Sequence, residues 1–183
     1  VLDYNNGFSS PLLSTTPAQG AIFPAPATLQ ELQGTSEREL GDVYLHLGDI
    51  DSAIRVYSDH VAVHPGDVAA QRSLGVALLA GGQPDAGIER IQLAYRIDAT
   101  LAHRPLAIES LPDRTFFRNV LDETVRTAGR RSAPSDWFAV AVLMQADGQE
   151  GPARAALDQA KAGGLSGRFI DEMQAALPLP LSR

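Results

Sequence analysis

An internal repeat with a period of 34 residues constrains the fold of this chain more than any other feature. A shift of 34 positions places Leu40-Gly41 on Leu74-Gly75, and the small, aromatic and aliphatic positions that follow coincide as well. The matched pairs are Tyr44 with Leu78, Gly48 with Gly82, Ala53 with Gly87 and Tyr57 with Ile91. A shift of 66 from the second copy gives a third, with Gly148 and Leu157 at the corresponding places. Such repeats predict stacked units, none of which buries its apolar face alone.

Helical periodicity within each copy predicts that the unit is a hairpin of two helices. Apolar residues of the first copy recur three and four apart: Leu40, Val43, Tyr44 and Leu47, then Ile54, Tyr57 and Val61. We expect Gly48 to end the first helix and Asp49 or Asp51 to cap the second. Small residues at fixed offsets predict close helix crossings, at Gly41, Gly75, Ala141, Ala53, Gly87 and Ala153. Larger side chains should fill the space between hairpins, namely Tyr44, Tyr57, Leu78, Ile91 and Leu157.

The first copy resembles the tetratricopeptide repeat. That family's pattern of leucine-glycine, tyrosine, alanine, aromatic residue and proline is met by Leu40, Gly41, Tyr44, Ala53, Tyr57 and Pro65. The second copy keeps Leu74, Gly75 and Ala94, and the third keeps Trp137, Ala153, Leu157 and Ala160. The resemblance implies an all-α fold, a short α-solenoid of stacked hairpins, whose function is to bind other polypeptides.

The chain divides into an arm, a repeat domain and a short tail. Residues 1–33 are rich in Pro, Ser, Thr and Ala and predict an extended arm. The helical-repeat domain covers 34–177, with units at about 34–67, 68–101 and 134–167. An irregular segment, 102–133, replaces one unit and contains an amphipathic bridging helix; a capping helix is expected over 165–177, followed by the tail 178–183.

Composition argues against several classes of function. The formal net charge of −7 predicts no nucleic-acid partner, and no apolar run is long enough to predict membrane insertion. The absence of cysteine excludes disulfides, thiolate nucleophiles and cysteine-rich zinc sites. Neither a nucleophile elbow nor a phosphate loop is present, so we expect no enzyme and no cofactor. The first residue, Val1, is not methionine, which favours a processed and exported product.

Two polar clusters are candidate sites. His60 and His64 lie four residues apart, the spacing at which two imidazoles can share a metal, but a packing or helix-end role is the preferred interpretation. A basic stripe on the bridging helix could hold an acidic or phosphorylated partner, or be a solvated face. It consists of Arg114, Arg118, Arg126 and Arg130, opposite the inward-facing Phe116, Phe117, Val120, Leu121 and Val125.

The resemblance also implies a concave groove, lined by the first helix of each hairpin. Its residues would be Arg38, Asp42, Leu45, His46, Arg72, Val76, Leu79, Phe138 and Val142. Family members that bind a C-terminal carboxylate have a basic residue and an asparagine one turn apart. In this chain Asp42 follows Arg38 at the asparagine position, and the second copy has Val76 there, so the chain departs from the carboxylate-binding pattern. A largely apolar groove of this kind suits an extended segment with spaced apolar anchors.

The arm is itself such a segment. Its anchors would be Leu12, Leu13, Ile22 and Phe23, and its prolines lower the entropy lost on docking. The leading hypothesis is a non-catalytic scaffold that self-assembles into an oligomer or filament when the arm of one copy docks on a neighbour. The alternative is an adaptor whose groove binds a different protein while the arm acts as a lid. The fold alone does not identify the partner.

Overall fold

The computed structural model describes residues 36–108 and 111–177, and in these ranges it contains helices and no strand. The three hairpins are α1 (Glu37–Leu47) with α2 (Ile50–Val63), α3 (Val68–Ala80) with α4 (Pro84–Ile97), and α6 (Pro134–Ala146) with α7 (Glu150–Ala162). Between the second and third hairpins lie the 3-10 helix η2 (Ala99–His103) and α5 (Arg114–Arg131), and α8 (Arg168–Ala176) follows the third. The predicted all-α fold of stacked hairpins is therefore confirmed.

The helix boundaries follow from capping residues in the sequence. Ser36 and Glu39 form a capping box at the start of α1, with the Ser36 side chain accepting from the Glu39 N–H and the Glu39 carboxylate from the Ser36 N–H. Asp49, Asp67 and Asp113 accept backbone N–H groups at the starts of α2, α3 and α5. These carboxylates satisfy amides that have no partner inside the helix.

The repeat is visible in the backbone at one glycine of each hairpin. Gly48, Gly82 and Gly148, which the sequence shifts superpose, follow the first helix of their hairpins with φ of 76°, 73° and 71°. This left-handed conformation is easily adopted only by glycine and turns the chain into the second helix. The three turns are thus equivalent in geometry as well as in sequence.

Small residues let the two helices of a hairpin approach closely, as predicted. A Cβ at Gly41 would lie 2.6 Å from Cε1 of Tyr57, and one at Gly75 would lie 2.6 Å from Cγ1 of Ile91. These contacts correct one detail of the prediction. Tyr57 and Ile91 pack across their own hairpins, onto the glycine of the partner helix, instead of only filling the space between hairpins.

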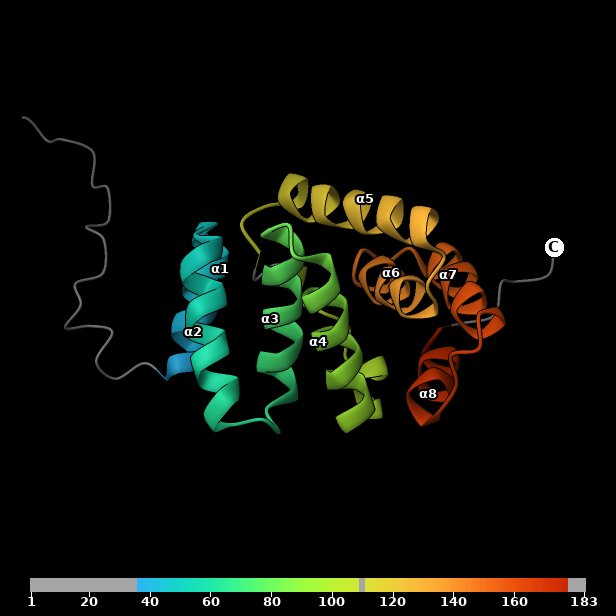
Figure 1. Cartoon of the computed structure of the whole chain (residues 1–183), viewed down its shortest axis with the longest axis horizontal. Helices are drawn as coiled ribbons and strands as arrows, with labels where there is room; N and C mark the ends of the chain where they lie inside the picture. The colour runs from blue at the N-terminus through green and yellow to red at the C-terminus, as the bar shows by residue number, and fades with distance from the viewer. Residues whose placement is uncertain (1–35, 109–110, 178–183) are drawn as a thin grey trace, which may run out of the picture. The chain divides into compact units, whose positions relative to one another are not determined.

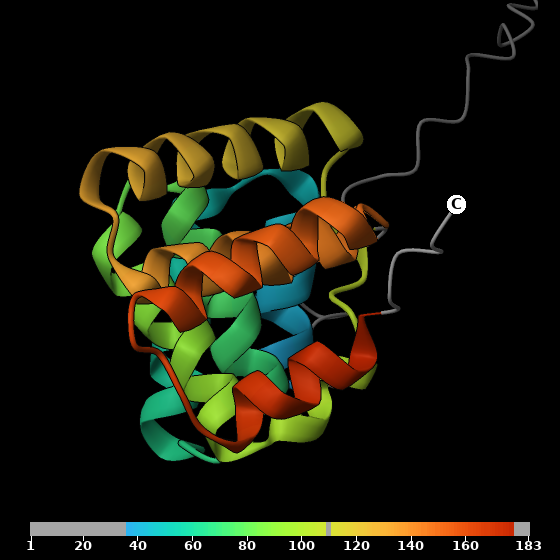
Figure 2. The same ribbon diagram turned by 90° about the vertical axis from the view of Figure 1, so that its right-hand side faces the viewer.

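The helices α3 and α6 are buried along most of their length, because other elements surround them. Figure 1 shows α1 to α4 side by side, α5 lying across the ends of α3 and α4 and over α6, and the α6–α7 hairpin turned relative to the first two hairpins. Figure 2 shows α8 running below α7, and α8 packs mainly against η2. The helix predicted as a cap over 165–177 therefore contacts η2 more than it contacts α7.

Candidate functional site

The surface of the predicted groove is occupied by the chain itself. The connector, which we define as residues 102–108 and 111–113, from the last residues of η2 to the start of α5, is hydrogen-bonded to the first helices of the second and third hairpins. From α3, Nη1 of Arg72 donates to the carbonyl oxygen of Arg104 at 2.6 Å, and from α6, Nε2 of Gln145 donates to the carbonyl of Ala102 at 2.8 Å. Two helices distant in sequence thus bind the same stretch of main chain.

The structure corrects the groove prediction at its apolar positions, since all five of them are buried. They are Leu45, Val76, Leu79, Phe138 and Val142. Leu79 lies beneath α5, beside Val120 and Thr124. Phe138 lies between Tyr95 and Phe169, with ring centroids 5.4 Å and 5.0 Å away. Elements outside the repeat thus contribute to the burial of Leu79 and Phe138, and the groove residues that are not buried are all polar.

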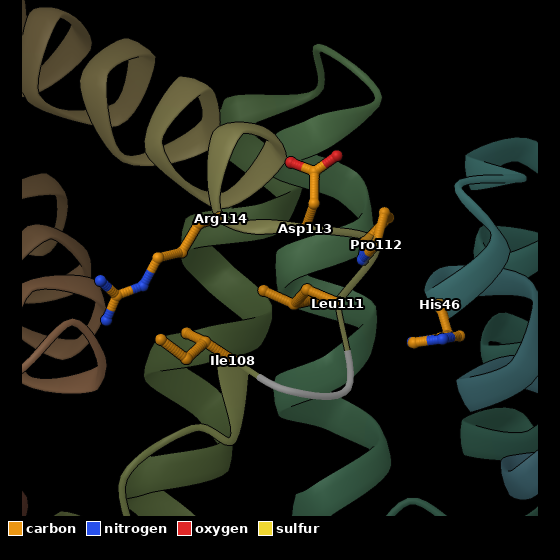
Figure 3. Close-up of a pocket in the computed structure, with 6 residues that line it drawn as sticks. All are labelled: His46, Ile108, Leu111, Pro112, Asp113 and Arg114. Carbon is orange, nitrogen blue, oxygen red and sulfur yellow. The ribbon is translucent and has the colours of Figure 1, made fainter.

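A pocket of about 330 Å³ remains where the connector meets the first hairpin. Figure 3 shows the connector residues Ile108 and Leu111 facing His46 of α1 across this pocket, with Pro112 beside them. Asp113 and Arg114 complete the lining, and Arg114 points away from His46. His46 is the one predicted groove residue among the lining side chains.

Two polar groove residues of α1, Arg38 and Asp42, belong to a network that joins the first three helices. Arg38 lies 3.9 Å from Asp42 and 3.8 Å from Asp67, and the Tyr57 hydroxyl donates to Oδ1 of Asp42 at 2.5 Å. Burial, together with Asp42, raises the pKa of Tyr57. The network holds α1 against α2 and α3, and its hydrogen bonds are typical of a structural role.

His60 takes part in the same network. Its Nε2 lies 3.0 Å from Oδ2 of Asp67, and its ring centroid is 4.8 Å from that of His64. Burial favours a higher pKa for Asp67, but the hydrogen bonds from the Ala70 amide and His60, with the charge of Arg38, outweigh it and lower that pKa. Within the described ranges, no three His, Asp or Glu side chains converge as a metal site would require.

The basic stripe is partly neutralised by acidic neighbours on the same helix. Arg126 and Arg130 both pair with Glu123, the latter at 3.2 Å. Arg114 and Arg118 are exposed at the other end of α5. The inward face of α5 is confirmed, because Phe117, Val120 and Leu121 are buried and Phe116 and Val125 are half-buried against the core.

An exposed apolar surface lies on α1, and we call it the α1 side face; its residues are Leu40, Val43, Tyr44 and Leu47. Val43 is 41% exposed and Leu47 71%, while Leu40 and Tyr44 are half-buried. The corresponding residues of the second copy, Leu74, Ala77 and Leu78, are 1%, 0% and 6% exposed. In the third copy Val140 and Leu143 are fully buried. Among the other aligned positions, Gly81, which matches Leu47, is exposed, and Met144 and Asp147 of the third copy are half-buried. The face is therefore covered more fully in the second and third hairpins than in the first.

Sequence reasoning missed the polar side chains that fasten the connector and the hairpins. Gln145 is a single polar residue in the apolar run of α6, a pattern that indicates a buried hydrogen bond. Gln71 of α3 is likewise buried and donates to the carbonyl of Pro65 at 3.2 Å. Arg131 pairs with Asp136 at 3.3 Å and with Asp85, so the end of α5 is tied to α6 and α4.

The predicted anchors of the arm, Leu12, Leu13, Ile22 and Phe23, lie outside the described residues. In the ranges that are described, none of the helices combines the length and apolar character needed to cross a membrane.

Comparison with known proteins gives no family assignment. No protein-family model matches the chain. A search of curated proteins also finds no significant match.

Proposed function

We propose that this chain is a non-catalytic protein–protein interaction scaffold built from tetratricopeptide-like hairpins. Copies associate with one another when the N-terminal arm, residues 1–33, of one copy docks on the helical domain of a neighbour. Whether the assembly closes into an oligomer or continues as a filament depends on the symmetry of that contact.

The α1 side face is the observation that carries this proposal. Apolar side chains aligned on one helix are normally covered, and the residues aligned with Leu40 and Val43 are buried in both the second and the third hairpin. In the first hairpin Val43 and Leu47 stay exposed. Such a face favours association with another polypeptide, because covering it removes apolar surface from water.

An adaptor that binds a different protein in the concave groove is the second candidate. Arg72 and Gln145 donate to main-chain carbonyl groups, the kind of contact by which a groove holds an extended segment of any sequence. In this chain the connector already accepts both hydrogen bonds. An outside ligand would have to displace it, so we rank the adaptor below self-association.

The proposal is tested by the solution mass of the intact chain beside a variant that lacks residues 1–33, at matched concentration and salt. We expect oligomers or polymers of the intact chain and monomers of the truncated one. Monomers in both samples across the accessible concentration range would contradict self-association. The adaptor would then be tested by adding candidate peptides to the intact chain.

A further inference from the structure

We infer that the α1 side face is the surface on which the arm of another copy docks, through the apolar pairs Leu12-Leu13 or Ile22-Phe23. The inference rests on the proposed self-association and names the site at which it occurs. Three features of the described residues lead to this surface and to this occupant.

First, the connector already occupies the concave groove. The connector accepts the hydrogen bonds of Arg72 and Gln145, and its Leu106 and Leu111 are buried in the core. A neighbour's arm would have to compete there with a covalently attached segment, whose effective concentration is high. The α1 side face has no such competitor in the described part of the chain.

Second, end-to-end stacking of helical domains is disfavoured at the other end of the repeat. Within one chain, the first two hairpins stack because Ile54 and Val61 of α2 face α3. The residues of α4 at the same positions of the repeat, Ile88 and Tyr95, are buried. The corresponding positions of α7 are Arg154 and Lys161. Both are fastened to α8, since Arg154 donates to the carbonyls of Gln174 and Leu177 and Lys161 to the Gln174 side chain. The α7 end therefore offers charged groups where an apolar partner face would be needed.

Third, charge disfavours the pairing of two α1 helices. Glu37 and Glu39 stand at the start of α1, and Asp49 and Asp51 follow its end. Parallel or antiparallel pairing would bring acidic groups of the two copies together, which opposes association. The stretch of the arm between Asp3 and Glu31, which holds both apolar pairs, contains no Asp, Glu, Lys, Arg or His. An uncharged apolar segment fits this face without repulsion.

The dimensions of the arm also suit the face. Leu40 and Leu47 are seven residues apart on α1, about 10 Å along the helix axis, which an extended segment covers with three or four residues. One apolar pair and its neighbours are sufficient. From Phe23, the chain up to Ser36 can span about 40 Å, which is enough to reach a second copy.

The test compares the solution mass of the chain lacking residues 1–33 with that of the unaltered full-length chain and of three full-length variants. Leu47→Asp places a charge on the face, and Leu47→Ser removes the apolar side chain without adding charge. Leu93→Asp is the matched control, since Leu93 is also an exposed leucine but lies on α4. Circular dichroism checks that each variant keeps its helix content, which we expect because Leu47 is 71% exposed.

We expect Leu47→Asp to raise the concentration at half-assembly at least about tenfold, as deletion of the arm does, with a smaller rise for Leu47→Ser and none for Leu93→Asp. A synthetic peptide of residues 8–27 should dissociate the intact assembly. If deletion of the arm gives monomers while both Leu47 variants assemble normally, the arm docks elsewhere; the inference fails and the proposed function stands. If the arm-deleted chain still assembles, or the intact chain is monomeric, the proposed function fails together with the inference.

Discussion

The first and second hairpins are built from the same helix crossing, but neighbouring elements cover them to different extents. In both, a glycine of the first helix lies against a large side chain of the second, Tyr57 on Gly41 and Ile91 on Gly75. In both, the first helix carries an apolar face. On α3 the residues Leu74, Ala77 and Leu78 of this face are buried, whereas on α1 Val43 and Leu47 are exposed.

The difference teaches that coverage, and not the repeat motif, decides which surface is available for binding. The first hairpin has the more complete tetratricopeptide-like pattern, yet Val43 and Leu47 on its apolar face are exposed. The second hairpin has the looser pattern, but α2, α4, α5 and the connector surround α3. Among the described residues, the hairpin with the closely matching motif thus has the two most exposed large apolar side chains, Leu47 and Val63.

Truncating one leucine at equivalent positions should give the largest contrast between the two hairpins. Leu74 and Leu40 are superposed by the repeat, and only Leu74 is fully buried. We expect Leu74→Ala to lower the free energy of unfolding by about 3 kcal/mol, and Leu40→Ala by about 1 kcal/mol. Urea unfolding of the arm-deleted chain, followed by circular dichroism, measures both. Equal losses would show that the two faces are covered alike.

The glycine at each helix crossing should be the next most sensitive position. A Cβ at Gly75 would meet Cγ1 of Ile91 at 2.6 Å and the carbonyl oxygen of Gly87 at 2.9 Å, and that backbone cannot easily move. At Gly41 the obstacle is the Tyr57 ring alone. We expect a loss of about 2 kcal/mol for Gly75→Ala and about 1 kcal/mol for Gly41→Ala in the same unfolding assay. A gain in stability for Gly75→Ala would rule out the close crossing.

The two tyrosines of the first hairpin should differ although both belong to the motif. The Tyr57 hydroxyl is buried and donates to Asp42, so Tyr57→Phe leaves that carboxylate without its donor. We expect a loss of about 1.5 kcal/mol in the free energy of unfolding. Tyr44→Phe, on the α1 side face, is the control and should cost less than about 0.5 kcal/mol. Equal effects would contradict the structural role of the Tyr57 hydrogen bond.

Asp67 should make a small, pH-dependent contribution where α3 meets the first hairpin. Its pKa in the folded chain lies below the ordinary 3.8, so its contribution to stability is complete above that value and is lost as pH falls through the folded pKa. Asn caps helices as well as Asp does, so Asp67→Asn should cost only about 0.5–1 kcal/mol at neutral pH. The unfolding free energies of variant and parent should converge towards pH 2. A gap that persists at low pH would mean that the charge of Asp67 is not responsible.

The repeat explains how much of this structure is predictable from the sequence. Hairpin positions, the turns at Gly48, Gly82 and Gly148, and the inward face of α5 depend on local periodicity and backbone conformation, which the sequence shows directly. The environment of Phe138 was not predicted, because it includes Phe169 of α8, which lies outside the repeat. A short irregular segment has no periodicity that indicates where it packs.

The central claim is that self-association covers the α1 side face, and a single label on that face tests it directly. The chain contains no cysteine, so Leu47→Cys gives one attachment point for an environment-sensitive fluorophore. A trace of labelled chain is mixed with excess unlabelled chain, with and without residues 1–33. We predict that rising concentration of the intact chain shifts the emission to the blue and protects the label from a soluble quencher, and that the arm-deleted chain shows neither change. Equal exposure of the label in both chains, at concentrations where the intact chain is assembled, would contradict the account.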